Sequence, residues 1–336
     1  MRIQMTIEKL SFLDLMQEFD EELSGASQRA PQGNTEDELL RDLPLSDAVD
    51  NEILMHRDSH FGGKFSIMLD YYESEGKGTD PEIKLSRIHQ LMEMEQQLGK
   101  NLAPAMLTGP EAEEVGRARE AYKQLRSIYE IENLQSPIPR LISDLILTED
   151  EEAEKEVDAV VQAGPDIVPS LISLLMKDEY LNPLFPGYGF APILAAECLG
   201  KIGDESSIRS LFEVIGKDSE EIEMAAIDAL RNIGDPAKTF LIQVLEGRPF
   251  TADNRNAGMA LGLGFIGDEE VASTCFEQLK VWEGEENQTF LGFLVLSCVG
   301  LQSELRDSFK VWAESRPFSS DLSFEFEAVF SDWKGE

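Results

Sequence analysis

The chain has 336 residues, of which 65 are acidic and 29 basic, so its formal net charge at pH 7 is −36. A surface this acidic disfavours nucleic acids and anionic membranes, because a protein binds both through lysine and arginine. The three cysteines, Cys198, Cys275 and Cys298, lie inside apolar segments at spacings that suit neither a disulfide framework nor a zinc-binding motif, and no apolar run is long enough to span a bilayer.

The first 135 residues predict an all-helical region interrupted by a linker. Residues 3–23 have the apolar spacing of an amphipathic helix, without the apolar stretch of a signal peptide. Residues 24–44 are rich in glycine, serine, proline, asparagine and glutamine, which is typical of a flexible linker. Helical spacing returns over 81–98 and 111–131. We therefore expect two regions, 1–135 and 136–336.

Glu52, His56 and His60 follow one another at intervals of four residues, and we name them the Glu–His cluster. On a helix they share one face, and two imidazoles one turn apart are able to bind a divalent metal. His89 or Asp58 would supply a further ligand. The order is not the His-Glu-x-x-His order of a metalloprotease. The alternative is structural, with the ring nitrogens bonded to neighbouring carboxylates or to the backbone.

From about residue 137 a short phrase recurs. Ile-Gly-Asp stands at 202–204, 233–235 and 266–268, and weaker copies surround Gly164 and Gly300. Each copy follows a helical segment with small residues and precedes one with larger apolar residues at helical spacing. The glycine would close the first helix in a left-handed conformation, and the aspartate would cap the second. The pattern predicts stacked helical pairs.

The phrase of two small residues, a leucine and Ile-Gly-Asp, followed by an apolar helix, resembles the HEAT-like repeats, in particular the short form named after phycobilisome lyases. The resemblance covers residues 137–312. It implies an all-α fold, a right-handed superhelix of about five helical pairs. The aromatic C-terminal end, which includes Phe326 and Trp333, would cap the last pair.

An insertion separates the first two repeats, over residues 180–190. Pro183, Pro186 and Pro192 favour a loop of fixed shape over a helix. Aromatic side chains on a stiff loop lose little entropy on binding, so these are candidate partner-binding residues. The alternative is that they fold back on the first repeat. The four aromatic residues are Tyr180, Phe185, Tyr188 and Phe190.

Two basic–amide pairs are further candidates for partner contact. Arg231 with Asn232, and Arg255 with Asn256, lie on the helices that line the inner face in HEAT-like proteins. The sequence thus predicts a cytoplasmic scaffold or adaptor that binds a protein on this face, with a basic partner favoured by the negative charge.

No residue is assigned a catalytic role, and no cofactor is expected. The competing hypothesis is a metal-assisted or lyase-type enzyme that uses the Glu–His cluster. An acidic mimic of nucleic acid ranks last, because the acids form runs and scattered pairs rather than a regular stripe. The oligomeric state stays open.

Overall fold

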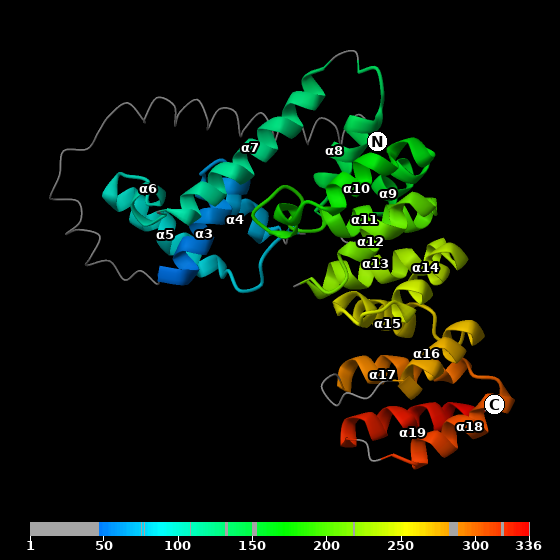
Figure 1. The fold of residues 1–336 in the computed structure, drawn as a ribbon. Helices are drawn as coiled ribbons and strands as arrows, with labels where there is room; N and C mark the ends of the chain where they lie inside the picture. Colours follow the sequence, from blue (N-terminus) through cyan, green and yellow to red (C-terminus); the bar gives the residue numbers. More distant parts are fainter. Residues whose placement is uncertain are drawn as a thin grey trace. The chain divides into compact units, whose positions relative to one another are not determined.

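The structure is a computed structural model that describes residues 47–335, apart from 75, 77, 108, 132–133, 150–152, 218, 282–287 and 317–318. All secondary structure in these residues is helical (Figure 1), which confirms the predicted all-α fold. The helix expected at 3–23 and the linker at 24–44 lie outside the described residues. The handedness of the predicted superhelix and the domain boundary at 135/136 stay predictions.

The chain forms two compact units, and the 180–190 insertion belongs to the first. That unit runs to Glu156 and takes in Lys177–Ala191, whereas the second contains Val157–Met176 and continues from Pro192. The helices of the first unit are α3 (Asp47–His60), α4 (Phe65–Glu73), α5 (Leu85–Leu98), α6 (Ala103–Met106), α7 (Pro110–Glu130), α8 (Ile138–Ile146) and the 3-10 turn η2 (Asp178–Leu181).

In the first unit α3 packs against α6 and α7, and α4 packs against α5. The turn between α3 and α4 contains Gly62 and Gly63, both with positive φ, a conformation that glycine adopts without strain. Apolar side chains from α3 to α7, with Ile53, Met68 and Ile88 fully buried, form its core. The helix predicted at 81–98 begins at Leu85 in the structure.

The second unit is a succession of helical hairpins that follow one another from α10 to α19 (Figure 1). α12 pairs with α13, α14 with α15, and α16 with α17. Its elements are η1 (Gly164–Ile167), α10 (Val168–Leu175), α11 (Ala191–Ile202), η3 (Glu205–Ser207), α12 (Ile208–Glu213), α13 (Glu220–Ile233), α14 (Asp235–Glu246), α15 (Ala252–Gly264), α16 (Glu269–Val281), α17 (Gln288–Ser297), η4 (Cys298–Gly300), α18 (Ser303–Glu314) and α19 (Ser320–Gly335). α9 (Glu154–Val161) crosses the boundary between the units.

The Ile-Gly-Asp turns have the predicted geometry with one difference. The glycines at 203, 234 and 267 all have positive φ. The Asp204 carboxylate accepts a hydrogen bond from the Ser206 amide at 2.9 Å, and Asp268 accepts one from the Val271 amide at 3.1 Å, so both cap the next helix. Asp235 instead begins α14, and its carboxylate lies 3.1 Å from the Lys238 ammonium.

Glycines also set how closely the helices before these turns approach one another. A Cβ on Gly200 of α11 would lie 2.6 Å from Cα of Ala229 on α13, and one on Gly262 of α15 would lie 2.8 Å from the Phe293 carbonyl oxygen of α17. α13 in turn contacts α15. Helices α11, α13, α15 and α17 therefore lie side by side, and we call them the glycine layer.

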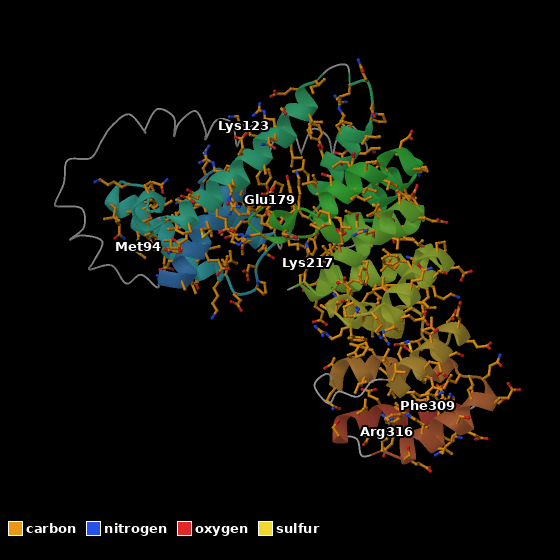
Figure 2. The ribbon with its side chains drawn as sticks, viewed as in Figure 1. Met94, Lys123, Glu179, Lys217, Phe309 and Arg316 are labelled. Atoms are coloured by element: carbon orange, nitrogen blue, oxygen red, sulfur yellow. The ribbon has the colours of Figure 1, made fainter. Side chains whose placement is uncertain are left out.

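Aromatic rings of α18 and α19 pack together and against the preceding hairpin. Phe309 lies on α18 (Figure 2). Its ring centroid is 5.2 Å from that of Phe276 in the preceding hairpin, and the Trp333 indole donates a hydrogen bond to the Val299 carbonyl at 2.9 Å. The three cysteines are free and buried, in agreement with a packing role. Within the described residues, no helix combines the length and apolar character needed to cross a membrane.

Candidate functional site

The Glu–His cluster lies on one helix, as its spacing predicts, but its members have different neighbours. Glu52 and His56 lie one turn apart on α3. Asp80, on the segment before α5, joins them. One ligating atom from each of these three side chains lies within 4.8 Å of the other two. The structure thus brings together one imidazole and two carboxylates. This group contains Asp80 in the place of the predicted His60.

His60 is engaged elsewhere. Its Nε2 lies 2.8 Å from the carbonyl oxygen of Pro183, and its Nδ1 lies 2.7 Å from the hydroxyl of Tyr122. Because a carbonyl oxygen only accepts, we assign the proton to Nε2, and the Tyr122 hydroxyl then donates to Nδ1. Burial lowers the pKa of His60 to about 3, so the ring is neutral at neutral pH. With both nitrogens occupied, His60 has the structural role that the sequence left as the alternative.

The environment of His56 is unlike that of His60. The side chain is 3% exposed, and its Nδ1 is buried without a hydrogen-bond partner among the described residues. Burial lowers the pKa of His56 to about 4, which leaves a neutral imidazole at neutral pH. Burial, with the nearby negative charges of Asp80 and Glu82, raises the pKa of Glu52.

The two other predicted ligands lie apart from this group. The Nε2 of His89, on α5, is 3.8 Å from a carboxylate oxygen of Glu73. Asp58 points to Arg57, whose Nε donates to it at 2.7 Å. Sequence reasoning missed Asp80. The only signal for it was an acidic residue shortly after the Gly76–Gly78 turn, and such a residue is commonly a solvated loop residue.

The insertion keeps the irregular shape that its prolines predict, but its aromatic rings are buried within the first unit. Tyr180, Phe185 and Tyr188 are 5%, 2% and 9% exposed, and Phe190 is half-buried. The Tyr188 ring stacks on the His60 imidazole with centroids 4.2 Å apart. These rings fill a core in which α3 and α7 take part, because a buried aromatic ring is more stable there than in water.

The backbone of the insertion is shaped to make this possible. Gly187 has φ +84°, and a Cβ there would lie 2.1 Å from the Ile146 carbonyl oxygen. Tyr188 itself has φ +52°, an uncommon value for a residue with a side chain. The Tyr71 hydroxyl, whose ring is parallel to that of Tyr188, donates to the Glu149 carboxylate at 2.7 Å. The loop is thus held in one conformation by its own contacts.

The candidate contact residues of the repeats lie on the glycine layer. Arg231 and Asn232 are exposed near the end of α13, where Arg231 lies 2.8 Å from the Asp228 carboxylate. Arg255 and Asn256 are half-exposed at the start of α15. The Asn256 amide donates to the Ile215 carbonyl at 2.8 Å, so this side chain also joins one hairpin to the preceding one.

A comparison with family models matches residues 191–262 to a family described as HEAT repeats. The chain contains HEAT-like repeats. The match runs from the start of α11 into α15, which covers the first two Ile-Gly-Asp turns. No curated protein matched the chain, and no solved structure did. The finer resemblance, to the repeats named after phycobilisome lyases, stays a prediction.

In these HEAT repeats each helix of the glycine layer buries one face against its hairpin partner and its neighbours in the layer, so its remaining face is open. On α13 that face carries Met224 and Asp228, both exposed. The positions on α11, α15 and α17 that correspond to Met224 and Asp228 are half-exposed, and within each helix they are three or four residues apart. They are Ile193 and Glu197 on α11, Arg255, Met259 and Leu263 on α15, and Phe293 and Leu296 on α17.

Proposed function

We propose that this chain is a protein-interaction scaffold or adaptor, and that its partner binds across the open face of the glycine layer. HEAT repeats commonly serve as such scaffolds, because stacked helices present one extended surface. The observation that carries the proposal is the run of four adjacent helices with matching open faces. We take this open face to be the inner face that the sequence predicts.

The chemistry of this face favours a partner with both apolar and basic side chains. Met259, Leu263, Phe293 and Leu296 are apolar and half-exposed, and the negative charge of Asp228 on α13 is paired with Arg231 at 2.8 Å. Partly buried apolar side chains at the centre of a contact supply most of its affinity, and surrounding charges steer the approach. The net charge of −36 adds long-range attraction for a basic protein.

We further propose a cytoplasmic location, which the three free, buried cysteines support. The insertion aromatics no longer contribute to the proposal. Their burial supports a role in holding the first unit together, with Tyr188 as the central ring.

The test uses two arginines of the second unit as a matched pair. Arg231, on the glycine layer, pairs with Asp228 at 2.8 Å, and Arg209, on α12 outside the layer, pairs with Glu213 at 3.1 Å. Both arginines are exposed and each pair lies within one helix, so Arg→Glu at either position costs less than about 1 kcal/mol of stability.

The full chain and both variants are used as bait in lysate of the source cells, and captured proteins are quantified by mass spectrometry. We expect one dominant partner, whose capture weakens at higher salt and changes at least about threefold in Arg231→Glu. Arg209→Glu retains the capture of the wild type. Equal capture by all three baits would move the binding surface away from the glycine layer, and a bait that captures no partner would argue against an adaptor.

A further inference from the structure

The group of Glu52, His56 and Asp80 in the first unit is not explained by the packing around it. The His56 side chain is only 3% exposed, and its Nδ1 has no hydrogen-bond partner among the described residues. A buried polar atom without a hydrogen bond costs about 1–3 kcal/mol. His60, one turn further along α3, has a hydrogen-bond partner for both nitrogens of its buried imidazole, from Tyr122 and from the Pro183 carbonyl.

The two carboxylates add a second unfavourable term. Ligating atoms of Glu52, Asp80 and His56 lie within 4.8 Å of one another, so two negative charges approach closely at a partly buried place. Like charges at this distance repel, and burial weakens the screening by water. Glu82 is close enough to raise the pKa of Glu52 further.

Helix α3 and two hydrogen bonds hold the three groups in position. Glu52 and His56 project from the same face of α3. The Asp80 carboxylate accepts a hydrogen bond from the Glu82 amide at 2.7 Å through Oδ1, and the Asp80 amide donates to the Tyr72 hydroxyl at 3.3 Å. The hydrogen bond engages one oxygen of this carboxylate and leaves the other for a ligand.

We propose that Glu52, His56 and Asp80 bind a first-row divalent transition metal, with Zn²⁺ the preferred ion. The cation would neutralise the repulsion between the carboxylates and take the lone pair of the neutral imidazole. A nitrogen ligand with two oxygen ligands suits Zn²⁺ better than Ca²⁺ or Mg²⁺, which prefer oxygen alone.

The present spacing is close to what a metal requires. Ligands about 2.1 Å from a tetrahedral zinc ion lie roughly 3.4 Å from one another. The side chain of Glu52 is half-exposed, so it is able to move the remaining ångström or so without disturbing the core. Three protein ligands leave one coordination position for water, as in zinc sites that are not purely structural.

The experiment uses the full chain, purified without a histidine tag and stripped with a chelator. Zn²⁺ binding is measured by calorimetry in excess Mg²⁺, which saturates weak binding to the 65 acidic residues. The variants are Glu52→Gln and Asp80→Asn, which preserve shape at half-exposed positions, and His56→Gln. His89→Gln is the control, because His89 is exposed and lies outside the group.

We expect one equivalent of Zn²⁺ per chain and at least tenfold weaker binding in each of the three variants, with His89→Gln like the wild type. Circular dichroism checks that each variant is folded, and if His56→Gln is not, the two carboxylate variants decide the question. Absence of a stoichiometric site, or a site that survives both Glu52→Gln and Asp80→Asn, would overturn the proposal. Because no partner is involved, this result is independent of the scaffold function.

Discussion

At the scale of single residues, α3 shows how environment separates two identical side chains. His56 and His60 lie one turn apart, and both are buried. His60 has a partner for each ring nitrogen, whereas Nδ1 of His56 has none among the described residues. Spacing in the sequence places both on one face, but it does not tell which of them a distant carbonyl will reach. The Pro183 carbonyl that bonds His60 is 123 residues away along the chain.

The burial of His60 predicts a loss of stability in acid. Burial holds its pKa near 3, below the ordinary value of 6.5. Between these values the unfolded chain binds a proton that the folded chain does not, so the free energy of unfolding falls as the pH falls through this range. Going from pH 6.5 to about 4.5, this one residue should cost about 2–3 kcal/mol.

A variant without this titration separates His60 from the carboxylates. His60→Gln keeps a polar group of similar reach and does not ionise. Urea unfolding at neutral pH and at about pH 4.5 should therefore show a smaller acid-dependent loss in the variant, by the same 2–3 kcal/mol. If wild type and variant lost the same stability, His60 would not be the group that stays neutral in the folded chain.

At the scale of helices, two glycines inside helices predict opposite effects of the same substitution. Gly200 lies in α11, where an added Cβ would be 2.6 Å from Cα of Ala229. Gly116 lies in α7, exposed, with no atom within 4 Å of an added Cβ. Alanine forms helices better than glycine by about 1 kcal/mol, so Gly116→Ala should stabilise the chain by up to that amount.

In Gly200→Ala the helices of the glycine layer must separate, and overpacking of this kind costs about 1–3 kcal/mol. The higher helix propensity of alanine offsets only part of that cost, so we expect a net loss of stability. Thermal unfolding followed by circular dichroism measures both variants against the wild type. A stabilised Gly200→Ala chain would mean that α11 and α13 do not depend on their close contact.

The same helices show what the sequence alone is able to predict. The Ile-Gly-Asp phrase specifies the turns because its glycines need positive φ and two of its aspartates cap helices, both local effects. The start of a helix is harder to predict where no residue caps it. For example, α5 begins at Leu85, later than the predicted start at residue 81. Two features depend on contacts between residues far apart in the chain, which local patterns do not contain. They are the place where the insertion aromatics pack and the approach of Asp80 to α3.

At the scale of the whole molecule, the net charge of −36 lowers stability through self-repulsion. Salt screens this repulsion over a Debye length of about 10 Å at 0.1 M. Salt also weakens attractive ion pairs, and Lys238 is a place where several of them meet. Its ammonium lies 3.1 Å from Asp235, 3.0 Å from Asp268 and 3.2 Å from Glu270, across two successive turns.

Because repulsion among 65 acidic groups outweighs these few pairs, we expect the unfolding temperature to rise by a few degrees between low and moderate NaCl. Lys238→Met keeps the apolar stem but removes the attraction, so its unfolding temperature should start lower and rise more steeply with salt. Differential scanning calorimetry of both chains over one salt series provides the measurement. A fall with salt in the wild type would show that ion pairs dominate. The expected rise in unfolding temperature has a functional counterpart. The negative charge that destabilises the free chain is also the charge that attracts a basic partner. Salt should therefore stabilise the fold while it weakens the complex.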